Sequence, residues 1–147
     1  MKIAIGADHA GYEYKPQIIE LVKQLGHEVI DFGTNSLNST DYPSYAFLVG
    51  KAIQSKQADF GILICGTGIG MSIAANKVKG VRAAAIQNEF AAKATREHND
   101  ANVLCVGSRT NSLTDVLSFV RIFLDTPYSN GERHQKRVNM ISDYEEE

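Results

Sequence analysis

The hexapeptide Cys65-Gly66-Thr67-Gly68-Ile69-Gly70 gathers the residue types of a reactive site at one point of the chain. It follows the apolar run 60–64 and leads into a helical pattern over 71–77. The glycines leave the backbone N–H groups at the start of that helix open to negatively charged oxygen atoms. A helix N-terminus also favours a thiolate over a thiol. The sequence therefore predicts a nucleophilic or basic sulfur beside donors for an oxyanion.

Other sites for phosphate fit this hexapeptide poorly. The dinucleotide fingerprint needs Gly-x-Gly-x-x-Gly, and a P-loop ends in Gly-Lys-Ser/Thr. A low-molecular-weight phosphatase also holds a cysteine at a strand end, but its Cys-x5-Arg loop would need arginine where the chain has Met71. A noncatalytic nucleotide-binding or phosphate-binding module remains an alternative, because the glycines alone would suit one.

Two polar side chains follow the first apolar run. Asp8 and His9 come directly after residues 2–7, just as Cys65 follows its own run. Because parallel strands end at one edge of a sheet, we expect these side chains to lie near Cys65. A carboxylate there can hold a substrate hydroxyl group. A turn that caps the following helix also fits the pair, and both interpretations stay open.

Two more side chains are expected at this edge. Arg109 follows the last apolar run, 103–106, and His98 ends a helical segment over 89–97. We expect His98 to face the same edge, where the helix C-terminus favours its charged form. An acid, a base and a nucleophile would then lie within reach of one another. A histidine at a helix end is also often satisfied by solvent alone.

A basic cluster occurs near the C-terminus. Arg133, His134 and Arg137 are three and four positions apart, so they share one face of a helix. Guanidinium groups on such a face can donate paired hydrogen bonds to a dianionic phosphate, and Arg109 could join them. The same composition also fits the solvated face of a terminal helix.

Short apolar runs alternate with helical patterns along the chain. This alternation predicts an α/β fold with a parallel sheet covered by helices on both sides. The expected strands are 2–7, 28–32, 60–64, 81–86 and 103–106. A last helix, about 133–144, has no strand after it and could pack on its own sheet or on a neighbouring molecule.

Composition narrows the possible partners. The 147 residues fit one domain, and a net charge of -2 from interspersed signs provides no basic stripe for nucleic acid. No stretch has the length and apolarity of a membrane span, and no signal-type segment begins the chain. The two cysteines form no Cys-x-x-Cys pair, so we expect a cytoplasmic protein. The four histidines show no ligand spacing, so we expect no metal.

Several separated motifs stand in order along the chain. They are Asp8-His9-Ala10-Gly11, Thr40-Asp41-Tyr42-Pro43, Cys65 to Gly70 with Ala74-Ala75-Asn76-Lys77, Glu97-His98-Asn99-Asp100-Ala101-Asn102, and the segment 131–137. Together they resemble ribose-5-phosphate isomerase type B. The resemblance implies a three-layer Rossmann-like sandwich with a five-stranded parallel sheet. It also implies a homodimer or homotetramer with shared active sites, and cofactor-free, metal-free interconversion of ribose 5-phosphate and ribulose 5-phosphate.

The resemblance also assigns roles to residues. Cys65 is the base that moves a proton between C2 and C1, and His98 is the acid that opens the sugar ring, assisted by Asp8 and Thr67. The resulting enediolate is held by backbone N–H groups of Gly66, Thr67, Gly68, Ile69 and Gly70. The other residues that bind the sugar phosphate are Asp8, His9, Tyr42, Asn99, Arg109, Arg133, His134 and Arg137.

The length of the sugar is left open by these motifs. The same superfamily includes galactose-6-phosphate isomerase, whose two subunit types divide the functional residues, and allose-6-phosphate isomerase activity. Here all the motifs occur in one chain, which favours a self-sufficient enzyme. One branch of the family has glutamate where Met71 stands, so this chain resembles the cysteine branch. The loops 35–39 and 87–90 could reshape the pocket for a six-carbon sugar.

Overall fold

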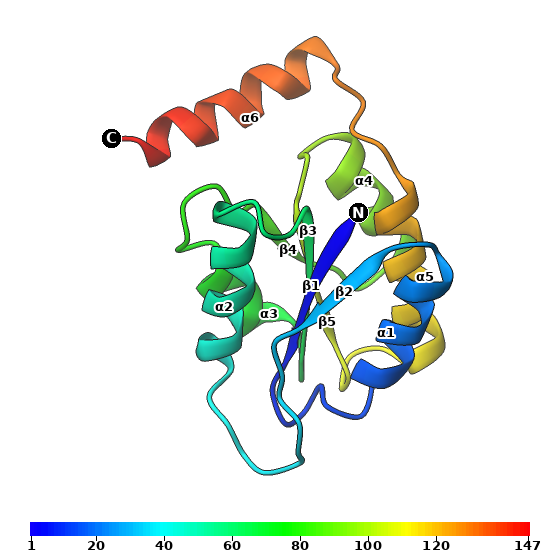
Figure 1. Cartoon of the computed structure of the whole chain (residues 1–147). Helices are drawn as coiled ribbons and strands as arrows, with labels where there is room; N and C mark the ends of the chain where they lie inside the picture. Colours follow the sequence, from blue (N-terminus) through cyan, green and yellow to red (C-terminus); the bar gives the residue numbers. More distant parts are fainter.

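The fold is a parallel sheet of five strands with helices on both faces (Figure 1). A computed structural model describes residues 1–147. The strands are β1 (Lys2–Ala7), β2 (Glu28–Asp31), β3 (Phe60–Cys65), β4 (Ala83–Ala85) and β5 (Val103–Gly107), and their order in the sheet is β2-β1-β3-β5-β4. The three-layer α/β sandwich expected from the alternating pattern is therefore confirmed.

Each face of the sheet carries its own hydrophobic core. On one face, α1 (Lys15–Gln24), α4 (Glu89–Glu97) and α5 (Leu113–Asp125) pack over Ile62 and Ile64. On the other face, α2 (Tyr42–Gln54) and α3 (Ile69–Ala75) pack over Leu63 and Cys65. This alternation along β3 arises because successive side chains of a strand point to opposite faces. The Cys65 side chain therefore lies on the face covered by α2 and α3.

The strand order creates a crevice between β1 and β3. From β1 the chain moves outward to β2, and it then returns to form β3 on the other side of β1. The helices α1 and α2 consequently lie on opposite faces, and no connection covers the carboxyl ends of β1 and β3. Ligands of open α/β sheets bind at such a switch point. The segments after these two strands are the Asp8-His9 pair and the Cys65 hexapeptide.

The strand expected over 81–86 is the prediction that differs most from the structure, since β4 spans only Ala83–Ala85. Two backbone N–H groups at its start donate to side chains, although Arg82 O still accepts a hydrogen bond from Val103 N of β5 at 3.3 Å. The Arg82 N–H donates to Asn102 Oδ1 at 2.7 Å, and the Ala83 N–H donates to Asn76 Oδ1 at 2.8 Å. Elsewhere the predicted strand ends differ from the observed ones by at most one residue.

The last helix, α6 (Glu132–Glu145), stands apart from the layers (Figure 1). Val138 is its one buried residue, whereas Met140, Ile141 and Tyr144 are exposed. The helix passes the amino ends of the strands, on the side of the molecule opposite the β1 and β3 crevice (Figure 1). It does not pack on its own sheet in the way that the other helices do.

Candidate active site

The Cys65 loop forms a tight turn from strand to helix at the crevice. β3 ends at Cys65, and Gly68 caps α3 with a φ of 81°. The Gly68 N–H donates to Cys65 Sγ at 3.1 Å, so a backbone donor stabilises negative charge on the sulfur. A methyl group added at Gly68 would lie 3.0 Å from the backbone of Cys105, which leaves room for glycine alone.

The neighbouring strand β5 holds this loop in place. Cys65 O accepts a hydrogen bond from Ser108 N at 2.9 Å, and Gly66 O accepts one from Arg109 N, also at 2.9 Å. The Arg109 side chain then lies along the loop, because a methyl group added at Gly66 would be 3.2 Å from Arg109 Nη1. Arg109 is therefore at the edge where the sequence placed it, beside the Cys65 loop.

Tyr42 covers the other end of the loop. It is the first residue of α2, and its ring lies against Gly70. A methyl group added at Gly70 would be 2.6 Å from Tyr42 Cζ, so only glycine permits this contact. The aromatic ring remains partly exposed beside the loop.

The Asp8-His9 turn lies next to the Cys65 loop. Asp8 N–H donates to Ile64 O at 3.2 Å, which ties the turn to the end of β3. Asp8 Oδ1 accepts hydrogen bonds from Ala10 N at 2.9 Å and Gly11 N at 3.1 Å. One carboxylate oxygen therefore serves a backbone turn. It does not cap the following helix, as the sequence allowed, because the N-cap of α1 is Tyr14 and has no side-chain hydrogen bond.

A backbone contact fixes the form of the His9 imidazole. Thr40 N–H donates to His9 Nδ1 at 3.2 Å. Nδ1 must therefore be unprotonated, and in the neutral ring Nε2 carries the hydrogen. His9 presents a donor at Nε2, as an anion-binding histidine requires.

The expected position of His98 is wrong within a single chain. His98 is the C-cap of α4, a helix that begins after the carboxyl end of β4 and returns to the amino end of β5. A helix that joins two parallel strands must reverse the chain direction, so its two ends lie at opposite edges of the sheet. His98 and the adjacent Asn99 therefore lie at the amino edge, whereas Cys65 lies at the carboxyl edge.

The basic cluster of α6 accompanies His98 at the amino edge. The imidazoles of His98 and His134 stack with ring centroids 4.5 Å apart and planes 10° from parallel. Desolvation, followed by the positive charges of His98, Arg133 and Arg137, lowers the pKa of His134. These residues form one cationic group, but in this chain the group is not beside Arg109, contrary to the expectation that Arg109 could join it.

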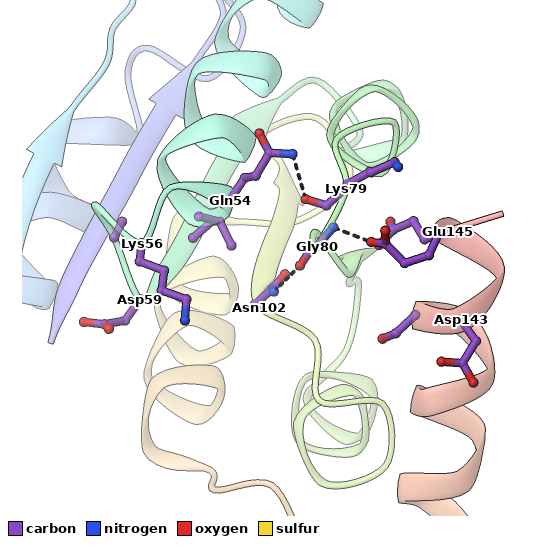
Figure 2. A pocket seen from close by; sticks show the side chains of 12 residues that line it. Gln54, Lys56, Asp59, Lys79, Gly80, Asn102, Asp143 and Glu145 are labelled. Carbon is purple, nitrogen blue, oxygen red and sulfur yellow. Dashed lines mark hydrogen bonds between the residues drawn. The ribbon is translucent and has the colours of Figure 1, made fainter.

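The end of α6 borders a cavity of about 790 Å³ at the same edge (Figure 2). Gly80 N–H donates to Glu145 Oε1 at 2.9 Å across it, and Gln54 Nε2 donates to Lys79 O at 3.3 Å. Figure 2 shows that its lining combines side chains of α2, α6 and the segment before β4. No residue of the Cys65 hexapeptide lines this cavity.

Cys105 differs from Cys65 in its surroundings. Both thiols are free, but burial, with a smaller contribution from Cys65, raises the pKa of Cys105 far above the usual thiol range. Cys105 is therefore a packing residue behind the loop. No group of three or more histidine, cysteine, aspartate or glutamate side chains is placed to hold a metal ion. None of the helices combines the length and the apolar character that crossing a bilayer requires.

Sequence reasoning missed Lys15, which is buried near the Asp8-His9 turn with 3% of its surface exposed. One feature of the sequence does indicate that Lys15 is buried. Lys15, Ile18 and Val22 are three and four positions apart, so this lysine lies on the apolar face of α1 and not on its solvated face. Its partners could not be read from the pattern, since they lie at the end of the next strand, β2, and in the connection that follows it.

Known proteins resemble this chain in sequence and in fold. Residues 3–141 match the family described as Ribose/Galactose Isomerase. Ribose-5-phosphate isomerase B of Escherichia coli is 46% identical over 99% of this chain and 97% of its own length. The solved structure of Clostridium thermocellum ribose-5-phosphate isomerase B is 48% identical, covers 99% of this chain and 98% of its own, and superposes with a TM-score of 0.96.

One further solved structure contains a sugar phosphate. Ribose-5-phosphate isomerase B of Mycoplasma genitalium, with bound ribulose-5-phosphate, is 43% identical to this chain and superposes with a TM-score of 0.94. The match covers 99% of this chain and 97% of that one. Since the family match, the full-length relatives and the superposed folds all agree, this chain belongs to the ribose/galactose isomerase family.

Proposed function

We propose that this chain is an aldose–ketose isomerase that interconverts ribose 5-phosphate and ribulose 5-phosphate. The observation that carries the proposal is the Cys65 sulfur, which accepts a hydrogen bond from Gly68 N–H at the switch point of the sheet. A base and a set of oxyanion donors therefore occupy the place where ligands of this fold bind. Family membership and the relatives named for this reaction support the same substrate.

The chemistry needs one base and an environment for negative charge. The Cys65 thiolate takes the proton from C2 of the open aldose, and the electron pair of that C–H bond forms the double bond of an enediolate. Backbone N–H groups of the loop 66–70 stabilise the charge on its oxygen, and one such donor is typically worth about 10² to 10³ in rate. The hydrogen on O2 passes to O1, and the Cys65 thiol returns the proton to C1. The C=C bond is then replaced by the C2=O bond of the ketose, and Cys65 is a thiolate again.

Ring opening and phosphate binding require a second copy of the chain. His98, which we propose as the ring-opening acid, lies at the sheet edge opposite to Cys65. Two copies that place the amino edge of one against the carboxyl edge of the other would complete each site. Each partner would then supply its His98 and the adjacent Asn99, together with the basic groups of α6, namely Arg133, His134 and Arg137.

Exposed apolar side chains support this assembly. On α2 and α3 they are Phe47, Leu48, Ile69 and Ile73, and on α6 they are Met140, Ile141 and Tyr144. We therefore propose that residues 1–147 form one domain whose helix α6 packs on a neighbouring subunit of a homodimer or homotetramer. The two free thiols suit a reducing compartment such as the cytoplasm.

The test is the exchange of the C2 proton in heavy water, measured by NMR with ribose 5-phosphate, allose 6-phosphate and galactose 6-phosphate. We expect exchange and ketose formation with ribose 5-phosphate, and a loss of about 10²- to 10⁴-fold in Cys65→Ser, because the serine hydroxyl is a poor base. Cys105→Ser is the matched control and should retain activity. Absence of exchange with the pentose, or wild-type rates in Cys65→Ser, would contradict the proposal.

A further inference from the structure

Lys15 makes a set of contacts that helix packing does not require. Its ammonium group donates to both carboxylate oxygens of Asp31, at 2.9 Å and 3.0 Å. It also donates to Thr34 O at 2.6 Å and to Asn35 Oδ1 at 3.1 Å. A lysine with 3% exposure is uncommon unless its charge is paired, and here every donor has a partner.

All of these partners belong to one segment of the chain. Asp31 ends β2, Thr34 and Asn35 begin the connection between β2 and α2, and Lys15 itself lies in the first turn of α1. Asp31 Oδ1 additionally accepts a hydrogen bond from Gly33 N at 2.9 Å, so the same carboxylate shapes the start of the connection. Lys15 thus ties this connection to the helix that follows the Asp8-His9 turn.

The connection in turn contacts the candidate site. Ala7 N–H donates to Gly33 O, and Thr34 N–H donates to Ala7 O, both at 2.6 Å. These bonds lie immediately before the Asp8-His9 turn. Further along the connection, Thr40 N–H donates to His9 Nδ1. The path from Lys15 to the His9 imidazole therefore consists of one short segment that is bonded at both ends.

We propose that Lys15 is a positioning residue for the phosphate of the substrate, acting through segment 31–40 on His9. This inference rests on the proposed function, because it takes His9 as a phosphate ligand. With the segment in place, Thr40 N–H keeps His9 in the form that carries hydrogen on Nε2. Without the ammonium group, the segment loses its common anchor, and the imidazole is free to turn and to change tautomer.

The structure predicts that loss of Lys15 weakens phosphate binding but does not slow the proton transfer at Cys65. Lys15 acts at the connection before α2, whereas the Cys65 loop is held by Ser108 N and Arg109 N, which follow β5 directly. Loosening segment 31–40 therefore leaves the base and its N–H donors where they are. If Lys15 served stability alone, its loss would not raise KM while leaving kcat nearly unchanged.

The experiment compares Lys15→Met with Lys23→Met in the full-length protein. Lys23 is an exposed lysine near the end of the same helix, so its substitution controls for the loss of one positive charge from α1. We expect Lys15→Met to raise KM for ribose 5-phosphate and Kd for inorganic phosphate about tenfold, as for one lost hydrogen bond to a charged group. We expect kcat to change less than about twofold and Lys23→Met to resemble the wild type.

Two measurements do not depend on turnover. The ¹⁵N chemical shifts of His9 should report a single tautomer in the wild type and a mixture in Lys15→Met. Amide hydrogen exchange should accelerate at Thr34 and Thr40 but not at Gly68. If the wild type failed to isomerise ribose 5-phosphate, the proposed function would fall, and these measurements with phosphate binding would still decide the role of Lys15.

Asp31→Asn provides a second variant in case Lys15→Met does not fold. The Asp31 side chain is partly exposed, and asparagine keeps one oxygen acceptor while it removes the charge. We expect Asp31→Asn to raise KM and to change the ¹⁵N chemical shifts of His9 in the same direction as Lys15→Met, but by a smaller amount. An unchanged His9 tautomer in a folded variant, or a fall in kcat at constant KM, would overturn the proposal.

Discussion

The division of the proposed site between two subunits can be tested by mixing two inactive variants. Cys65→Ser removes the proposed base and His98→Asn removes the proposed acid, and these residues lie at opposite edges of the sheet in their own chain. Each variant alone therefore contains only damaged sites. In a hybrid dimer, one site combines the intact Cys65 of one chain with the intact His98 of the other, while the second site carries both substitutions.

The size of the recovered activity follows from the symmetry of the assembly. Random exchange of equal amounts of two subunits makes about half of the dimers hybrids, and each hybrid has one intact site of two. The mixture should therefore reach about one quarter of the wild-type activity. The background is far lower, because each substitution alone is expected to cost about 10²- to 10⁴-fold.

The assay unfolds the two variants together in urea, refolds them, and follows ribulose 5-phosphate formation while native mass spectrometry counts the hybrids. A mixture of Cys65→Ser with Asp8→Asn is the matched control. Those two residues lie at the same edge, so both sites of their hybrid are damaged and no activity should return. Hybrids of Cys65→Ser and His98→Asn that form but remain inactive would refute the division of the site.

Two further predictions concern Gly68 and His134. Gly68→Ala should destabilise the protein by about 1–3 kcal/mol more than Gly26→Ala, since both glycines have positive φ but only Gly68 has backbone within 3.0 Å of the added methyl group. Urea unfolding compares the two variants, and equal losses would show that the close approach to β5 does not matter. For His134, desolvation and the neighbouring charges of His98, Arg133 and Arg137 lower the pKa, so the ring loses its proton at a lower pH than an ordinary histidine. His98→Asn should raise the pKa of His134 toward 6.5, as followed by ¹⁵N NMR titration, and an unchanged or lower value would contradict the contribution of the stacked pair.

The sequence by itself determined the fold class and the main loop of the site. Strand positions could be read because an apolar run of a few residues reflects burial on both faces of a sheet, which is a local property of the chain. The Cys65 loop was equally local, since a strand, a thiol, three glycines and a helix follow one another without interruption. The carboxyl ends of β1, β3 and β5 then had to meet at one edge, because the strands are parallel.

Only the tertiary structure decided where α6 and the partners of Lys15 lie. The edge at which His98 lies already follows from the parallel strands, because a helix between two of them ends at the amino edge, whereas the stacking of His98 on His134 depends on where α6 lies. Lys15 could be seen on an apolar face, but its acceptors are 16 to 20 positions away, at the end of β2 and just after it. Such contacts depend on how the chain crosses the sheet, and the direction of each crossing is a property of the assembled layers, not of any segment.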